Sequence, residues 1–209
     1  LLEASSRILP GFDADAAALV SLALRKNGRV EILTDSAIKA VAVDNGGKVK
    51  VQYVGGETTA DLMVCAIGRI PCTGGLGLEA LGIALDGKGY IRVDDNGYTG
   101  VGGIYAAGDV VAGGDASYAS AVFGAGQVAE LLFGANRRVC RRDVPRVVFT
   151  NPPVAMVGAF GDGLAQSFCP LRNNVKAMIS GDIEGFVKLS YHPATGKIAG
   201  AVIVGTGAE

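Results

Sequence analysis

The residues best suited to chemistry are Gly108 and Asp109, which follow an apolar stretch at residues 103–107. A glycine lets a ligand approach the backbone closely, and an aspartate carboxylate accepts hydrogen bonds from the hydroxyls of a ribose or a polyol. A glycine-rich loop and a helix of small residues at 117–133 come next, and the amino end of a helix offers free N–H groups to an anionic group. An aspartate that only caps a turn fits the same residues, so both interpretations stay open at this point.

The cysteine and histidine side chains lack the spacing that metal binding or redox chemistry requires. The single histidine, His192, is predicted to lie at the surface, in a turn that gives it neither a pocket nor an orienting partner. No pair of cysteines has C-x-x-C spacing, which disfavours a zinc site of the Cys/His kind and a two-cysteine redox loop. We expect ordinary buried or surface thiols at Cys65, Cys72, Cys140 and Cys169.

Two stretches match the dinucleotide-binding pattern G-x-G-x-x-A without the strand and long helix that this motif requires. The first, at residues 75–80, opens a helix that Gly82 closes after about one turn, which leaves little dipole for a pyrophosphate. The second, at residues 124–129, lies inside the helix predicted at 117–133, where the backbone N–H groups are already used. Its glycines are expected to allow close packing of that helix.

The elements that must position these residues begin with an α-to-β unit. A helix is predicted at residues 13–27, with Asp13 as its N-cap and Gly28 at its end, and a short strand follows at 30–33. The continuous apolar run at residues 61–67 indicates a strand that is buried on both faces. Together these patterns are typical of an α/β layer.

Shorter strands are predicted around these elements. Alternating apolar and polar residues at 37–43 and 48–54 flank an Asp-Asn-Gly-Gly turn, which is a strong hairpin signal. Further strands are expected at 90–93 and 103–107, and the second of these is predicted to be buried and to carry Gly108 and Asp109 at its end. Residues 78–81 form at most one helical turn.

The pattern changes to antiparallel β-structure near residue 143, where we place a domain boundary. The basic residues at 137–142 precede it and are expected to form a solvated linker. A turn at 192–196 joins the last two of four predicted strands, which span residues 147–150, 154–157, 185–191 and 197–204. Without a covering helix this sheet would leave one apolar face wet, so the isolated chain is expected to aggregate or to bind a partner.

Composition excludes several classes of function. Among the 209 residues, Lys and Arg number 19 and Asp and Glu number 20, so the net charge of −1 gives no field for nucleic acid. No apolar run is long enough to span a bilayer, so no membrane partner is expected either. The cysteines form no disulfide framework, which favours a reducing intracellular compartment such as the cytoplasm or mitochondrial matrix. Because the sequence starts at Leu1 without a signal-peptide pattern, it is expected to begin inside a longer protein.

Five segments in order along the chain resemble the class I pyridine nucleotide–disulfide oxidoreductases, which depend on FAD. Residues 99–110, which include Gly108 and Asp109, resemble the second FAD motif of that family. The other segments resemble the return from the NAD domain to the FAD domain, the stretch after it, the entry to the dimerisation domain and the central hairpin of that domain. They lie at residues 66–71, 76–83, 145–158 and 184–200.

The resemblance implies a fold of mixed α/β and α+β class. Residues 1–67 would be the C-terminal part of an NAD(P)-binding domain, and residues 68–142 the last segment of an FAD-binding domain of the three-layer FAD/NAD(P) type. Residues 143–209 would form a partial α+β dimerisation, or interface, domain. Between Gly158 and Cys169 only residues 162–166 would remain of a family helix.

The resemblance also implies roles for six cofactor-binding residues. Asp109 would accept hydrogen bonds from the ribityl hydroxyls of FAD, and Gly108 would allow its close approach. Ser117 and Tyr118 would place backbone N–H groups near the pyrimidine edge of the flavin, where charge develops on reduction. Gly68 and Arg69 would lie near the nicotinamide cofactor or the domain junction. No catalytic or metal-binding residue is predicted.

The parent protein implied by this resemblance transfers electrons between NAD(P)H and a disulfide or dithiol through FAD. A homodimer with a small-molecule or lipoyl-type dithiol substrate is expected, similar to dihydrolipoamide dehydrogenase, although Tyr118 fits the pattern of mercuric reductase better. The family's FAD and NAD fingerprints, redox cysteine pair and C-terminal His and Glu are not found in this sequence. The chain alone is therefore expected to be inactive and to bind FAD weakly or not at all. The alternative is a non-catalytic remnant that serves as a dimerisation or binding module.

Overall fold

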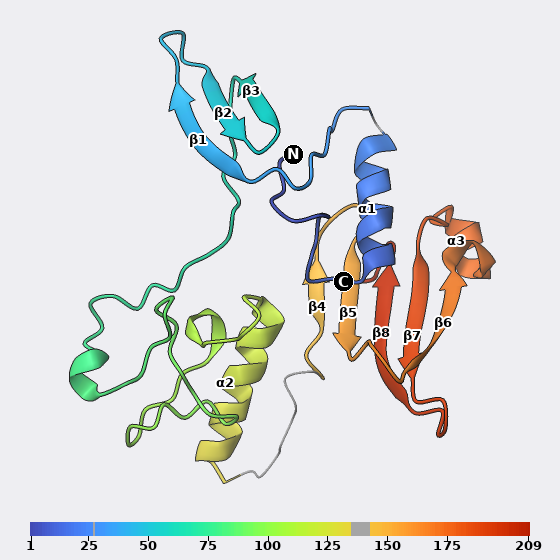
Figure 1. Ribbon diagram of the computed structural model, residues 1–209. Coiled ribbons are helices and arrows are strands. Elements are labelled where there is room, and N and C mark those ends of the chain that lie inside the picture. Colours follow the sequence, from blue (N-terminus) through green and yellow to red (C-terminus); the bar gives the residue numbers. More distant parts are fainter. Residues whose placement is uncertain (27, 135–142) are drawn as a thin grey trace.

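The computed structural model of this chain describes residues 1–26, 28–134 and 143–209. In those residues two antiparallel sheets and a separate helical region are joined by extended segments (Figure 1). The prediction of a basic linker at 137–142 and that of an ordinary thiol at Cys140 lie outside the described residues. The mixed α/β class expected from the sequence is confirmed.

The first sheet contains the predicted hairpin and one further strand. Strands β1 (Ile38–Val43) and β2 (Val49–Tyr53) pair in antiparallel fashion, and β3 (Gly56–Ala60) adds to the outer side of β2. In the turn, Asp44 Oδ1 accepts hydrogen bonds from the backbone N–H groups of Gly46 and Lys48 at 2.8 and 2.9 Å. The sequence missed β3 because this mostly exposed edge strand has no apolar alternation.

The second sheet has five strands in the order β4-β5-β8-β7-β6, all antiparallel. Their bounds are β4 Arg146–Val148, β5 Val154–Gly158, β6 Ala165–Pro170, β7 Phe186–Tyr191 and β8 Ile198–Val204. Four of them were predicted. The expected helix remnant at 162–166 is wrong, because Ala165 and Gln166 already belong to β6. That strand lies at the sheet edge and is largely exposed, so its sequence carries little hydrophobic pattern.

Helix α1 (Ala14–Lys26) lies against the second sheet, although the two are far apart in the sequence (Figure 1). Asp13 caps it as predicted, since its Oδ1 accepts from the N–H groups of Asp15 and Ala16 at 3.0 and 3.2 Å. The expectation that no helix covers the sheet is therefore wrong, although α1 covers one face only and alternate residues of β7 and β8, such as Ile203, stay partly exposed. The N-terminal segment and the sheet share one core, made of Ile8, Ala16, Val20, Ile32, Val154, Phe186, Val202 and Val204.

Helix α2 (Tyr118–Leu132) matches the helix predicted at 117–133. Gly124 lies inside it, and a Cβ at that position would come 3.4 Å from the Cβ of Ala107. The expected close packing is therefore present at this glycine. The other helices given for the described residues are short: the 3-10 turns Glu79–Leu81, Gly108–Val110 and Leu171–Asn173, and α3 at Val175–Ser180. No helix within the described ranges is long and apolar enough to cross a membrane.

The predicted buried strand at residues 61–67 is wrong. Leu62, Val64 and Ile67 are 77%, 81% and 83% exposed, and no strand in the described part of the chain pairs with this run. A strand needs neighbours that take its backbone hydrogen bonds, and an apolar run alone does not supply them. Local hydrophobicity predicted a strand here, but among the described residues no neighbouring strand lies beside the run to pair with it.

Three other predicted strands are reduced to isolated bridges. At 30–33 only Leu33 is paired, in parallel with Leu2. At 90–93 only Ile91 bridges other segments, and at 103–107 only Tyr105 does, opposite Tyr98. The stretch before Asp109 is thus neither a regular strand nor buried, because Gly103 is exposed and residues 104–107 are half-buried. Asp109 is carried by a turn instead of by an inner strand.

Candidate functional site

The turn at Gly108–Val110 lies directly against the first turns of α2. Gly108 has a φ of +78°, and a Cβ there would come 3.4 Å from the Cβ of Ala121. Glycine is needed for both reasons, because it accepts the left-handed conformation and leaves room for the helix. The sequence therefore places the backbone before Asp109 in close contact with the beginning of α2.

Asp109 forms an ion pair with Arg69, forty positions earlier in the chain. The distance between Arg69 Nη1 and Asp109 Oδ2 is 3.0 Å, and the backbone oxygen of Arg69 accepts from the hydroxyl of Tyr90 at 3.1 Å. The arginine side chain is 73% exposed and the aspartate side chain 46%, so the pair adds little to stability. Its value is geometric, since it brings two predicted cofactor-binding residues together. Gly68, with a φ of +129°, precedes Arg69 directly.

Ser117 is the N-cap of α2, and its hydroxyl oxygen accepts from the backbone N–H of Ser120 at 3.1 Å. This bond satisfies one of the amides that every helix leaves without an intrahelical acceptor. The amides of Tyr118 and Ala119 belong to the same first turn and form part of the positive end of the helix dipole. The side chain of Tyr118 is 86% exposed and points away from any core. What Tyr118 can offer a ligand in this position is its backbone.

A small hollow lies beside Gly108, between the turn and α2. Its volume is about 30 Å³, and its wall includes Gly97, Phe123 and Gly124 but not Asp109. That space suits a water molecule and is far too small for a flavin ring. Gly108, Asp109 and the first turns of α2 are therefore neighbouring parts of the structure, and we refer to the exposed surface that they form as the wall. This surface offers one carboxylate acceptor at Asp109 and the backbone N–H groups of a helix start.

The other reactive side chains stay apart from this wall. Cys65, Cys72 and Cys169 are free and exposed thiols, as the sequence allowed. His192 is exposed in the turn between β7 and β8, as predicted. Within the described ranges no three His, Cys, Asp or Glu side chains gather where they could hold a metal ion. These residues give no support to a metal-dependent or thiol-based site in those ranges.

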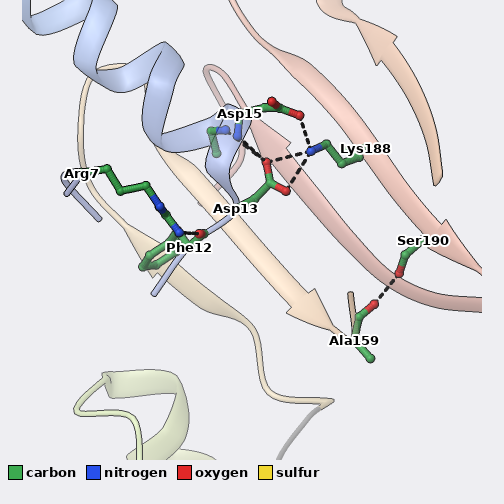
Figure 2. Close-up of polar contacts among 8 residues, drawn as sticks. Arg7, Phe12, Asp13, Asp15, Ala159, Lys188 and Ser190 are labelled. Atoms are coloured by element: carbon green, nitrogen blue, oxygen red, sulfur yellow. Dashed lines mark hydrogen bonds and ion pairs between the residues drawn. The ribbon is translucent and has the colours of Figure 1, made fainter. Parts of the chain in front are cut away.

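The sequence missed one ionic cluster, formed by Lys188 with Asp13 and Asp15 (Figure 2). Lys188 is only 5% exposed and lies on the face of β7 that α1 covers. A signal for it was available: Phe186, Lys188 and Ser190 occupy alternate positions of one strand and are all buried. A lysine on the apolar side of such an alternation needs a carboxylate partner from another element.

Two family descriptions match this chain, one after the other. Residues 1–129 match the family described as "Pyridine nucleotide-disulphide oxidoreductase". Residues 144–209 match "Pyridine nucleotide-disulphide oxidoreductase, dimerisation domain". The first match contains all six predicted cofactor-binding residues, and the second contains the whole five-stranded sheet.

Similar curated proteins carry the name dihydrolipoyl dehydrogenase. The protein from Geobacillus stearothermophilus is 34% identical over 220 residues, and that from Staphylococcus aureus is 37% identical over 219 residues. Each alignment covers 100% of this chain and 46% of the relative. The chain thus spans about half the length of the curated relatives it matches.

Solved structures give the same picture. LpdA from Mycobacterium tuberculosis superimposes with a TM-score of 0.88 at 30% identity, over 98% of this chain and 46% of that protein. The HOCl-induced flavoprotein disulfide reductase RclA from Escherichia coli, in its Cu(II) complex, gives 0.85 at 28% identity, over 99% of this chain and 49% of that one. The similarity extends across both sheets and both longer helices of the chain.

Proposed function

This chain belongs to the pyridine nucleotide-disulphide oxidoreductase family, and on that basis we propose that it is part of a flavoprotein that moves electrons between NAD(P)H and a disulfide or dithiol. The observation that carries the proposal is the wall formed by Asp109, Gly108 and the start of α2. There a carboxylate paired with Arg69 follows a glycine whose backbone contacts α2, and the capped amino end of that helix begins nearby in the chain. The names of the relatives, dihydrolipoyl dehydrogenase and flavoprotein disulfide reductase, support the same reaction class.

The proposal divides the chain as the sequence suggested. Residues 1–67 would complete an NAD(P)-binding part, residues 68–142 the FAD-binding part, and residues 143–209 would belong to the dimerisation part. A homodimer is proposed for the parent protein because the second match is to a dimerisation domain. A lipoyl-type or small dithiol is the proposed substrate because of the names of the relatives.

Each residue of the wall has a defined task in this proposal. When bound, FAD would supply the hydride and electron chemistry, which no side chain provides. The Asp109 carboxylate would accept hydrogen bonds from the ribityl hydroxyls and so fix the ring at one depth. The amino end of α2, capped by Ser117, would present the Tyr118 and Ala119 amides to the pyrimidine edge. Preorganised N–H groups there would stabilise the negative charge that this edge gains on reduction.

Arg69 would hold the Asp109 carboxylate in place before the flavin arrives. The 3.0 Å contact fixes one carboxylate oxygen and leaves the other free to accept a hydroxyl. Because both side chains are partly exposed, exchanging the arginine for a ligand hydroxyl would cost little. Gly68 and Arg69 would then lie at the junction towards the nicotinamide cofactor.

One experiment tests the proposal directly. The protein encoded by the reading frame that carries this chain is purified, and its flavin content and NADH-dependent reduction of lipoamide are measured. We expect the unaltered protein to contain bound flavin. In an Asp109→Asn variant the affinity for flavin should decrease about tenfold, because a charged acceptor becomes neutral. An Asp162→Asn variant, altered in an exposed loop away from α2, is the matched control and should bind flavin normally.

A non-catalytic dimerisation or binding module remains the second candidate. The exposed apolar residues of the segment around 61–70 favour it, because such surface often marks contact with another chain. Three results together would support this candidate. The purified protein would contain no flavin, it would show no NADH-dependent activity, and the Asp109→Asn and Asp162→Asn variants would have the same flavin content and activity. For residues 1–209 alone we expect no turnover and weak flavin affinity in either case.

A further inference from the structure

Lys188 is the most deeply placed charge among the described ion pairs of this chain. Its Nζ lies 2.9 and 2.8 Å from the two carboxylate oxygens of Asp13 and 2.5 Å from Asp15 Oδ2 (Figure 2). Its side chain is 6% exposed, and the side chain of Asp13 is 12% exposed. A cation buried to this degree is tolerated only because two carboxylates compensate it.

The two carboxylates belong to the beginning of α1. Asp13 caps the helix through its Oδ1 and binds Lys188 with both oxygens, while Asp15 lies in the first turn. Acidic side chains at this end also interact favourably with the helix dipole. Burial by itself lowers the pKa of Lys188, but the hydrogen bonds and charges of Asp13 and Asp15 outweigh it and raise the pKa above 10.5. The lysine is thus charged under all ordinary conditions.

This cluster joins two parts of the chain that lie 175 residues apart. Asp13 lies in the region that matches the oxidoreductase family, and Lys188 lies in the region that matches its dimerisation domain. The apolar contacts of Ala16 and Val20 also join these parts, but hydrophobic contact has no direction. It holds α1 on the sheet without fixing where along the sheet the helix begins. A two-carboxylate clamp on one ammonium group does fix that point.

We propose that Lys188, Asp13 and Asp15 form an ionic lock that positions the nucleotide-binding part of the chain on the dimerisation part. The names of the two parts rest on the proposed function, whereas the lock itself rests on the contacts. Lys188 is a positioning residue in this view: it touches neither flavin nor nucleotide and acts through the location of α1. Without the lock, α1 separates from the sheet while the β1–β2 hairpin keeps its structure.

The chain contains a matched control for the lock. At the other end of α1, Lys26 Nζ pairs with Glu184 Oε1 at 2.5 Å and joins the same helix to the same part of the chain. The two side chains of this second pair are 65% and 62% exposed. An exposed pair contributes little, so removing it should leave α1 in place. Both interactions join α1 to the same part of the chain, and the control differs in being exposed and in having one carboxylate instead of two.

Hydrogen–deuterium exchange of the whole chain, read at the α1 amides, tests the proposal. Lys188→Met leaves the buried Asp13 carboxylate without a counter-charge, whereas Asp15 is 65% exposed, and exchange across α1 should accelerate on the order of 100-fold. Lys188→Met with Asp13→Asn should restore exchange to within about tenfold, because asparagine still caps the helix and most of the uncompensated charge is gone. Glu184→Gln should change exchange by less than about fivefold.

A milder variant keeps the test decisive if Lys188→Met fails to fold. Asp13→Asn alone preserves the cap and leaves Asp15 to pair with Lys188, so α1 exchange should accelerate by about tenfold while circular dichroism stays unchanged. Equal exchange in Asp13→Asn, Glu184→Gln and the unaltered chain would overturn the lock. So would a double variant no better than Lys188→Met. None of these readouts needs flavin or nucleotide, so a failure of the proposed electron transfer would be recognised separately.

Discussion

Two regions of this chain, the core shared by α1 and the second sheet and the segment that leads from residue 61 to α2, differ in how they use apolar side chains. In the first, Val20, Val154 and Val202 have no exposed surface at all. In the second, Ile67 is 83% and Ile70 is 90% exposed. The first region buries its central valines completely, whereas the second exposes the large side chains of its 61–70 stretch and buries a few later ones, namely Ile83, Ile91 and Val111.

The difference shows that a similar content of apolar residues serves two purposes in one chain. In the shared core these residues stabilise the fold, and burial of each side chain contributes about 1.5–3 kcal/mol. In the segment from 61 to 70 they contribute nothing of that kind and form a surface on which another surface could pack. Substitutions in the two regions should therefore have opposite consequences, large in the core and small in the segment.

The largest effect is expected from a charge in the shared core. Val202→Asp buries a carboxylate where the side chain has no exposed surface, and the chain should lose more than about 4 kcal/mol and unfold. Val64→Asp makes the same change at a position that is 81% exposed and should alter stability by less than about 0.5 kcal/mol. Urea denaturation followed by circular dichroism measures both. Similar losses in the two variants would remove the distinction between the regions.

A glycine pair sharpens the comparison at the level of the backbone. A Cβ on Gly158, at the end of β5, would lie 2.2 Å from the backbone oxygen of Ala199, and its φ is +80°. Gly158→Ala should therefore cost about 2–4 kcal/mol through overlap and strain. Gly100→Ala, with a φ of +86° and no atom near its Cβ, should cost about 1 kcal/mol through strain alone. Thermal unfolding of the two variants checks whether the loss of stability comes mainly from overlap with the neighbouring strand or from the positive φ.

An intermediate loss of stability is expected at alkaline pH, and it should come from the ion pairs of Lys188 beside the shared core. Because the folded pKa of Lys188 is raised above 10.5, the stabilisation from its charge is fully present below pH 10.5 and is lost as pH rises through the folded value. The free energy of unfolding should therefore decrease above about pH 10.5. Lys188→Arg, which stays charged to higher pH, should show a smaller decrease. Identical pH profiles would show that other groups cause the loss.

The smallest effect is expected at the cap of α2 in the second region. Ser117→Ala removes the hydroxyl that accepts from the Ser120 amide and should cost about 1 kcal/mol. Ser117→Asp keeps an acceptor at the same position and should restore this stability. Chemical denaturation with both variants measures the difference. A loss that aspartate does not restore would mean that Ser117 acts through packing and not through its hydrogen bond.

Local signals in the sequence predicted much of this fold. Asp13 before an alanine-rich run predicted α1, the Asp-Asn-Gly-Gly turn predicted the β1–β2 hairpin, and the run of small apolar residues at 117–133 predicted α2. Each of these depends on hydrogen bonds between residues a few positions apart. Such interactions are encoded locally, so the sequence is sufficient to find them.

The failures share a cause in long-range contacts. The run at 61–67 and the stretch at 103–107 were predicted as buried strands, but burial depends on neighbours that local pattern does not contain. The partners of Lys188 are 175 and 173 residues away, and Arg69 meets Asp109 across 40 residues. Residue types and position singled out Gly108 and Asp109, the resemblance supplied the other four site residues, and the flavin-binding role of Asp109 stays a prediction.

The core shared by the two ends of the chain affects how the protein is made. Ile8, Ala16, Val20 and Ile32 leave the ribosome long before Val154, Val202 and Val204 have been synthesised. At about 5–20 residues per second the early helix waits on the order of ten seconds for the strands it will cover. During that interval its apolar stripe has no native partner, so co-translational chaperones are expected to recognise nascent α1 in particular. The lysine that anchors the helix is synthesised 175 residues after Asp13.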